Sequence, residues 1–412
     1  MKSRYFQLFL VILAAGSIFP LVYLRNAYQE TMTEVFAISY AQLNNIYVAL
    51  GIAGSVGYIP SGWLADRFST KKLIFISLLM CGGAGIMLAQ IPSYSMVVFI
   101  YIIIGIGSVL TFWSSHMKIV KLLAPKAEEA RFFGMLDGGR GLIEAILATV
   151  ALFIFTTFLT RTDSTTPALQ GVIYMYSIFI LLVGFLVLIF VKEPSNSANT
   201  EPAEKVPLNK ETILQVLGNK YVLLLGLIIF LAYIVVWTLR YQSGFLQSVV
   251  NIDVVRVVQV MVVALWMRPI GGVLGGFLAD KFGKDKILII ALSIAVGGLV
   301  ALAIIPIVMP NLIFESLVVL IHLMVYAVRG TYWSLLGECN VDEQVLGKSI
   351  GLISFIGYIP DVLVPMISTW LLLGFGETTG QSAFFIFGAI MGFLSIFVIV
   401  IFRRKVIKRD GI

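Results

Sequence analysis

The chain has 412 residues, of which 59% are hydrophobic and only 12% are charged, and its formal net charge is +7. Soluble domains carry about 25% charged residues. The composition therefore excludes a soluble enzyme, a soluble nucleic-acid-binding protein and a disordered chain. A membrane-spanning helix needs about 20 mostly apolar residues, so the chain is long enough for about a dozen such helices joined by short loops.

Apolar runs separated by turn residues and charges predict an all-α integral membrane protein with twelve transmembrane helices. The expected segments are 4–31, 39–65, 72–91, 95–122, 130–160, 171–192, 220–248, 253–280, 286–309, 312–338, 344–375 and 381–403. Residues 193–219 are polar and rich in Pro, Ser and Asn, which is typical of a linker. We therefore expect two pseudo-symmetric six-helix bundles, 1–192 and 220–412, joined by a cytoplasmic linker.

Basic residues are unevenly distributed between the two sides of the predicted membrane. Of the 29 Lys and Arg residues, 22 lie in the terminal segments or in the loops after every second helix, and only Arg161 and Arg256 lie clearly in the opposite loops. The positive-inside rule then places both termini in the cytoplasm. This predicts a multi-pass protein of the plasma (inner) membrane, and it explains the basic charge without a nucleic-acid partner.

Two motifs repeat at nearly the same offset. A Gly-x-x-x-Asp-(Arg/Lys) pattern follows the second and the eighth expected helices, 214 positions apart, and Arg25 and Arg240 are 215 positions apart. The motif residues are Gly62, Asp66 and Arg67 in the first copy and Gly276, Asp280 and Lys281 in the second. Matches at corresponding helix positions indicate two similar halves. Parallel repeats of this kind are typical of secondary transporters with a midplane substrate site.

With these two loop motifs the chain resembles the major facilitator superfamily over its whole length. The resemblance implies alternating access by rocking of the two bundles, with a conformational role for the six motif residues. The first copy has Ser69 where that family commonly has glycine, whereas the second copy keeps Gly283. The motif carries no information about the substrate.

Eight charged residues remain inside the predicted helices. They are the arginines Arg25, Arg140, Arg240, Arg268 and Arg329 and the acids Asp137, Glu144 and Asp361. An arginine at a helix centre costs about 2.5–3.5 kcal/mol on insertion scales, so such residues face a water-filled cavity or a partner. Because arginines outnumber acids, we expect a cavity that complements an anion. The guanidinium fork suits phosphate, sulfonate and carboxylate groups.

A closer resemblance concerns the first and seventh helices. Residues 22–26 and 219–241 are similar to those helices in the organophosphate:phosphate antiporter branch, where an arginine from each helix binds the substrate phosphate. The resemblance assigns this role to Arg25 and Arg240. Asn26 replaces the lysine common in that branch, and the fifth helix lacks its histidine. Residues 133–144 look more like sugar-acid or sulfo-sugar-associated members of the same broad group.

Further candidates for substrate binding are Arg140, Arg329, Tyr241 and Trp333, because they are arginines inside the helices or aromatic residues beside one. Asp137, Glu144 and Asp361 are candidates for charge pairing or proton coupling. Asp137 and Arg140 are three residues apart, and Arg140 and Glu144 are four apart, so all three are expected on one helix face. They form either a self-neutralised cluster that stiffens the helix, or a pair of acids that hold Arg140 as a substrate-binding or gating residue. Arg268, before Pro269, either lines the cavity, locks the two halves or caps carbonyl groups.

The sequence contains no P-loop motif, so the energy for transport has to come from a gradient. We expect a secondary active transporter of a small organic anion, with a counter-anion or a proton as the coupled species. We do not expect the protein to be an enzyme or to need a cofactor or metal. We expect it to act as a monomer in the lipid bilayer. Alternatives are a proton-coupled symporter of a sugar acid or other carboxylate, and an exporter of cations or drugs, which the excess of arginine disfavours.

Overall fold

A computed structural model describes residues 4–124, 129–192, 218–341 and 346–410. All regular elements in these ranges are helical. Of the expected linker 193–219, only residues 218 and 219 fall among the described residues, so the linker prediction lies almost entirely outside them.

The first six expected helices are all present, and two of them are interrupted. The first is divided between α1 and α2, and the fourth contains a π-helical stretch, η1, between α5 and α6. The elements are α1 (Arg4–Val22), α2 (Arg25–Val35), α3 (Tyr40–Arg67), α4 (Thr70–Leu88), α5 (Tyr94–Gly105), η1 (Ile106–Thr111), α6 (Trp113–Leu123), α7 (Glu129–Thr162) and α8 (Thr165–Phe190).

The last six expected helices are also present, and three of them change geometry along their length. The elements are α10 (Lys220–Thr238), η3 (Leu239–Tyr241), α11 (Gln242–Gly244), η4 (Phe245–Val249), α12 (Val254–Phe282), α13 (Lys284–Ile304), α14 (Asn311–Thr331), η5 (Tyr332–Glu338), α15 (Leu346–Tyr358), α16 (Pro360–Phe375) and α17 (Glu377–Asp410).

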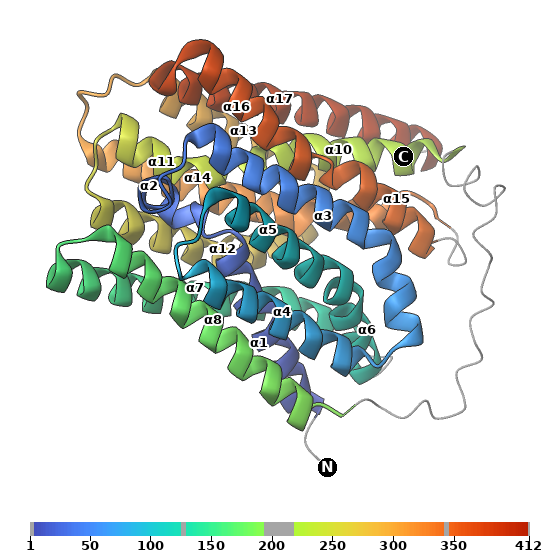
Figure 1. The fold of residues 1–412 in the computed structure, drawn as a ribbon. Helices are drawn as coiled ribbons and strands as arrows, with labels where there is room; N and C mark the ends of the chain where they lie inside the picture. The colour runs from blue at the N-terminus through green and yellow to red at the C-terminus, as the bar shows by residue number, and fades with distance from the viewer. Residues whose placement is uncertain (1–3, 125–128, 193–217, 342–345, 411–412) are drawn as a thin grey trace. The chain divides into compact units, whose positions relative to one another are not determined.

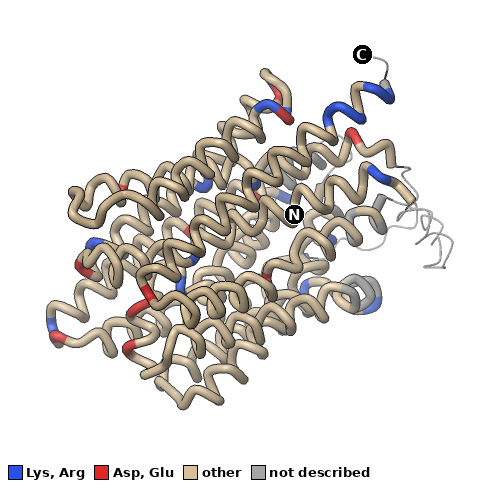
Figure 2. The backbone as a smooth tube through the Cα atoms, turned by 90° about the horizontal axis from the view of Figure 1, so that it is seen from above, with Lys and Arg blue, Asp and Glu red and all other residues tan. Residues whose placement is uncertain are grey.

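The helices have the length and composition that a bilayer requires. Counting only described residues, eleven helical segments are long and apolar enough to cross a membrane. The remaining expected span is α3, whose 28 residues exceed the length needed to cross the hydrocarbon core. Figure 2 shows long stretches of helix without a charged residue, and the basic end of α17 beside the C-terminus. The predicted all-α architecture of twelve spanning helices is confirmed.

By its internal contacts the chain divides into two compact units. The first unit comprises Met1–Ser195, Arg240–Pro269 and Pro365–Trp370, and the second comprises Asn196–Leu239, Ile270–Val364 and Leu371–Ile412. This division differs from the sequence halves 1–192 and 220–412, which stay a prediction. One consequence matters for the site: four of the five arginines within the predicted helices belong to the first unit.

Glycines bring α1 against α7 in the first unit. A Cβ atom on Gly16 would lie 2.6 Å from Ile143 Cβ, and one on Gly139 would lie 2.7 Å from Ile12 Cγ2. The two backbones can approach this closely only because these positions have no side chain. In the same unit α8 packs along α4 and α1. The close approach of α1 and α7 brings Phe19 on α1 to Arg140 on α7.

The second unit is built in a similar way from apolar helices and small residues. In it, α10 runs beside α17 and contacts α15, and α13 packs against both α14 and α17 (Figure 1). A Cβ atom on Gly275 of α12 would lie 2.8 Å from Ala327 Cα of α14. The end of α12, which carries the second loop motif, is therefore held tightly against α14.

The contact between α1 and α7 gives a test of the packing. Gly16→Ala places a methyl group against the branched Cβ of Ile143, which cannot turn away, so we expect a loss of about 1–3 kcal/mol in stability. Thermal unfolding of the purified protein in detergent measures it. Gly138→Ala on α7 is the matched control, because no atom lies within 4 Å of its added methyl group. A Gly16→Ala variant with the melting temperature of the wild type would contradict this packing.

Candidate functional site

Two helix breaks place Arg25 and Arg240. Helix α1 ends at Val22 and α2 begins at Arg25, whereas α10 ends at Thr238 and passes into the 3₁₀ turn η3, which contains Arg240. Within a membrane, irregular backbone is tolerated where it is buried in protein or lines a cavity. Broken helices at corresponding positions of two repeats indicate a transporter binding site.

Arg25 is fully buried and is held by neutral groups. Its Nη1 donates to Asn44 Oδ1 at 2.9 Å, and its Nη2 donates to Gln29 Oε1 at 2.6 Å. The guanidinium carbon lies 4.0 Å from the ring centroid of Tyr241 and 4.9 Å from that of Tyr47. Two amide oxygens and two π faces therefore surround the positive charge.

The charge of Arg25 is solvated by these neighbours and is not cancelled by them. In the part of the chain that the structure describes, no carboxylate lies within ion-pair distance of Arg25. Removing a guanidinium from water without an ionic partner costs several kcal/mol. A charged side chain inside a membrane-spanning segment is therefore a candidate functional residue, with its partners named above.

Arg240 and Arg140 are connected through two aromatic rings, Phe19 of α1 and Tyr23 directly after its end. The guanidinium carbon of Arg240 lies 3.5 Å from the ring centroid of Tyr23. Tyr23 stacks on Phe19, with centroids 6.2 Å apart and an interplanar angle of 15°, and the guanidinium carbon of Arg140 lies 3.7 Å from the Phe19 centroid. The Tyr23 N–H donates to the Phe19 carbonyl at 2.9 Å, so the helical spacing of four residues continues to Tyr23 and brings both rings to one side. The first unit therefore contains a continuous series of cations and aromatic rings.

Glu144 joins two arginines from different helices. Its Oε1 accepts from Arg140 Nε at 2.9 Å, and its Oε2 accepts from Arg268 Nη1 of α12. The Arg140, Glu144 and Arg268 side chains are 10%, 7% and 11% exposed. Of the roles considered for Arg268, the contact supports one in linking helices.

Two further contacts reinforce this link between α7 and α12. The indole Nε1 of Trp266 donates to Thr149 Oγ1 at 3.2 Å. Gly141 makes room for Arg268, because a Cβ atom on it would lie 3.3 Å from Arg268 Cγ and Cδ. Arg268 therefore lies flat against the backbone of α7 while it reaches Glu144.

Asp137 departs from the expected charge cluster. Arg140 and Glu144 share a buried face as predicted, but Asp137 is exposed. The angular position of Asp137 does not explain the difference, because Asp137 and Glu144 are seven residues apart and lie on one side of the helix. Their separation along the axis, about 10 Å, does explain it. The buried cluster therefore has a single acid from α7.

Other predicted residues lie in the second unit. Asp361 Oδ1 accepts from Trp237 Nε1 at 2.9 Å, and Trp333 Nε1 donates to the Tyr358 hydroxyl at 3.3 Å. Arg329 is half-buried in the last turn of α14. These contacts form a polar and aromatic cluster within that unit. The pairing of Asp361 with Arg329, or its protonation, stays a prediction.

The loop motifs occupy the last turns of α3 and α12. Asp280, Lys281 and Arg67 are exposed at these ends, and Gly276 is half-buried. Gly62 and Asp66 belong to α3, but their side chains fall outside the described residues. Both copies therefore lie near the end of a helix, and their conformational role stays a prediction.

The charge and hydropathy patterns of the sequence did not reveal the neutral residues around the arginines. Asn44 and Gln29 bond Arg25, and Phe19 contacts Arg140. The signal for Asn44 was a carboxamide inside a predicted apolar helix, and the signal for Gln29 was its spacing of four residues from Arg25. Charge counting overlooked both, because neither side chain is ionised.

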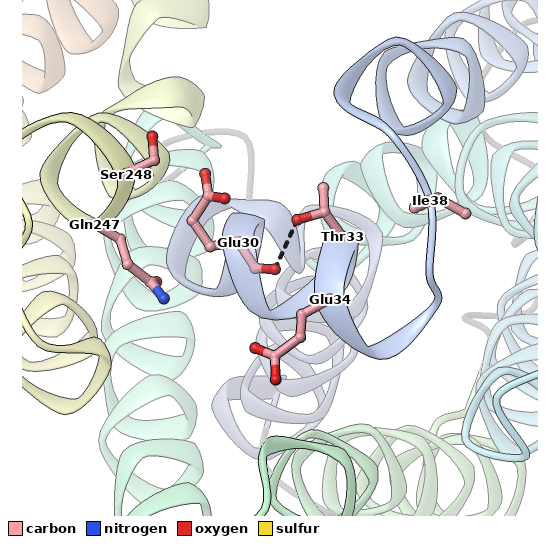
Figure 3. A pocket seen from close by; sticks show the side chains of 6 residues that line it. All are labelled: Glu30, Thr33, Glu34, Ile38, Gln247 and Ser248. Carbon is pink, nitrogen blue, oxygen red and sulfur yellow. Dashed lines mark hydrogen bonds between the residues drawn. The ribbon is translucent and has the colours of Figure 1, made fainter. Parts of the chain in front are cut away.

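A pocket of about 410 Å³ opens beyond Arg25 along α2. It is lined by Glu30, Thr33, Glu34, Ile38, Gln247 and Ser248. Figure 3 shows Gln247 and Ser248 of η4 opposite Glu30 of α2. Glu34 also accepts a hydrogen bond from Thr165 Oγ1 at 2.8 Å. Two carboxylates disfavour an anion, so we do not assign anion binding to this pocket.

Twelve apolar helices, with breaks beside buried arginines, define a multi-pass membrane protein with the architecture of a secondary transporter. The model of the Major Facilitator Superfamily matches residues 5–365, which is most of the chain. The chain therefore belongs to the major facilitator superfamily, a family of transporters and not of enzymes.

Two relatives and one solved structure extend this assignment. The Escherichia coli (strain K12) inner membrane protein YqcE is 29% identical over 373 residues, covering 89% of this chain and 87% of that protein. The inner membrane protein YihN of the same organism is 26% identical, covering 87% and 86%. The crystal structure of a D-xylose-proton symporter matches with a TM-score of 0.75 at 18% identity, covering 95% and 97%. The last likeness shows the fold alone.

Glu144→Gln tests the link between α7 and α12. The variant leaves two buried guanidiniums without the carboxylate that both of them bond, so we expect a loss of about 3–5 kcal/mol in stability. Asp137→Asn is the matched control on the same helix, and because its side chain is exposed we expect a change within about 0.5 kcal/mol. Thermal unfolding of both variants measures the difference. Equal melting temperatures would show that Glu144 does not hold this cluster together.

Proposed function

We propose that the protein is a secondary active transporter of a small organic anion that carries a phosphate, sulfonate or carboxylate group. The observation that carries the proposal is Arg25, a fully buried arginine held by neutral side chains at the break between α1 and α2. Arg240, at the corresponding break between α10 and α11, supplies the second guanidinium. The chain resembles the organophosphate:phosphate antiporter branch at these two positions, which supports the same assignment.

The roles of the remaining charged residues follow from their contacts. Arg140 is bonded to Glu144 and stacked on Phe19, so it can hold its position while a substrate binds near it. Tyr241 covers one face of Arg25 and restricts the directions from which an anion can approach. Arg329 and Trp333 are proposed as further contacts from the second unit.

Anion exchange is the coupling that we propose first. An exchanger needs an anion site that is occupied before the protein changes conformation, and two arginines at helix breaks are suited to that purpose. Proton symport of a sugar acid remains the alternative, with Glu144, Asp137 or Asp361 as the acid. The contacts of Glu144 with two guanidiniums favour a counter-ion role for that residue, which leaves Asp137 and Asp361 as the acids for symport.

Transport would proceed by rocking of residues 1–192 against 220–412, with the two loop motifs exchanging partners. Two relatives are named as inner membrane proteins, which supports the same membrane for this chain. The distribution of basic residues supports a cytoplasmic location for both termini.

Substituting the two arginines tests the anion site. Arg25→Ala and Arg240→Ala remove charge-assisted hydrogen bonds to the substrate, so we expect kcat/KM for anion uptake to fall by about 100-fold. Uptake into proteoliposomes is measured with radiolabelled inorganic phosphate, glycerol 3-phosphate, glucuronate and isethionate. These probes represent phosphate, phosphate ester, carboxylate and sulfonate chemistry.

The matched control for this test is Arg161→Ala, because Arg161 is an exposed arginine at the end of α7 and should leave uptake unchanged. Arg25→Lys should recover only part of the rate, because an ammonium cannot form the bidentate fork. The proposal fails if both alanine variants transport like the wild type. It also fails if the wild-type protein carries only neutral or cationic probes.

Reporter fusions test the proposed orientation. Green fluorescent protein becomes fluorescent in the cytoplasm, and alkaline phosphatase becomes active only on the opposite side of the membrane. Fused after the last residue, green fluorescent protein should therefore fluoresce and alkaline phosphatase should be inactive. Alkaline phosphatase inserted in the turn after Arg161 should be active, since this turn is expected on the opposite side. The reverse pattern would overturn the orientation and leave the fold unaffected.

A further inference from the structure

Asn44 is the residue through which Arg25 contacts several other elements. It is fully buried near the start of α3. Its Oδ1 accepts from Arg25 Nη1 at 2.9 Å and from the Tyr241 hydroxyl at 3.1 Å, and its Nδ2 donates to Thr369 Oγ1 at 3.0 Å. One carboxamide thus joins α3 to the start of α2, to η3 and to α16, and all four bonded residues belong to the first unit.

The orientation of this carboxamide follows from its partners. A guanidinium has only donors, so the oxygen of Asn44 has to face Arg25. Thr369 already donates its hydroxyl hydrogen to the carbonyl of Pro365 at 2.9 Å, so its oxygen accepts from the amide nitrogen. Each hydrogen bond of Asn44 is consistent with the others, and the side chain has no second orientation that satisfies them.

A carboxylate would satisfy the bonds to Arg25 and Tyr241 at least as well. Aspartate has the same shape as asparagine, and its charge-assisted bond to a guanidinium is stronger than that of an amide. It would give up only the donor to Thr369. The bonds to Arg25 and Tyr241 therefore do not by themselves require a neutral side chain beside the buried cation. The same holds for Gln29 on the other nitrogen of the fork, where a carboxylate would give up only the donor to the Tyr40 hydroxyl.

Neutrality at these two positions has one clear electrostatic consequence. An amide oxygen orients the guanidinium and leaves its net charge at +1, whereas a carboxylate would reduce the net charge of the pair to zero. In low-dielectric surroundings this difference decides whether an anion is attracted. The two tyrosine faces act in the same way, because they stabilise the cation without cancelling it.

We propose that Asn44 is a positioning residue for anion recognition, which fixes the guanidinium of Arg25 while leaving its charge available to the substrate. Gln29 has the same positioning role at the second terminal nitrogen of the Arg25 guanidinium. The inference rests on the proposed function of Arg25, and it adds a determinant of charge selectivity that is itself uncharged. It also places Tyr241 and Thr369, through Asn44, in contact with the group that binds the anion.

The test compares three substitutions at this position and its partner. Asn44→Asp keeps the shape and both accepted bonds but cancels the charge, so we expect an unchanged or higher melting temperature together with at least a 30-fold loss of uptake. Asn44→Ala leaves the charge of Arg25 but removes the bond that fixes its guanidinium. We therefore expect KM to rise several-fold, and by a larger factor than kcat falls. Gln29→Glu cancels the charge from α2 and should repeat the Asn44→Asp result.

The probes are the four radiolabelled anions described above, and KM and kcat are measured for each one that the wild type transports. Inorganic phosphate should also raise the melting temperature of the wild type and not that of Asn44→Asp. Asn45→Asp is the matched control, since it makes the same substitution one residue along at an exposed position of α3. It should transport like the wild type.

The opposite changes of stability and transport in Asn44→Asp distinguish this role from a purely structural one. If Asn44→Asp does not fold, Gln29→Glu decides the question. Normal uptake by a folded Asn44→Asp or Gln29→Glu variant, with uptake abolished in Arg25→Ala, overturns this inference and leaves the proposed function standing. Normal uptake by Arg25→Ala overturns both.

Discussion

The first unit is organised around the burial of one guanidinium. Arg25 lies with no exposed surface among apolar helices, and its neighbours are an asparagine, a glutamine and two tyrosine rings. The break between α1 and α2 brings its backbone to this position, and the hydroxyl of Ser243 donates to its carbonyl oxygen at 3.1 Å. The two carboxamides and the two rings solvate the cation, whereas the bond from Ser243 fixes its backbone. The position of the segment containing η3 and α11 against α2 depends on the same set of contacts.

Two other arginines of this unit have a carboxylate partner, and the contrast with Arg25 separates two kinds of charge. Arg140 and Arg268 share the carboxylate of Glu144, so their cluster is partly neutralised and links α7 to α12. Arg25 has no such partner among the described residues. A shared carboxylate suits a structural connection, because the bonds are strong and the net charge is small. Neutral partners suit recognition, because they fix a geometry while keeping the charge.

Membership of the major facilitator superfamily accounts for the fold and for transport as a class of activity. It does not select a substrate, since the D-xylose-proton symporter matches the fold at 18% identity. In the proposed function, selection comes from side chains at the helix breaks, which in this chain are arginines supported by carboxamides and tyrosines. The family supplies the scaffold, and the proposed anionic substrate class rests on the residues placed on it.

The sequence by itself determined the number and order of the spanning helices, the repeated loop motif and the presence of arginines inside the membrane. These follow from local hydropathy and spacing, which do not depend on distant partners. Only the tertiary structure decided that Glu144 bonds Arg268, that Asp137 is exposed and that Asn44 bonds Arg25 and Tyr241. Asn44 and Tyr241 are far apart in the chain, and an uncharged amide in an apolar helix gives no sign of its partner. Such contacts depend on how the helices pack and on where they break, and neither can be read from the periodicity of one segment.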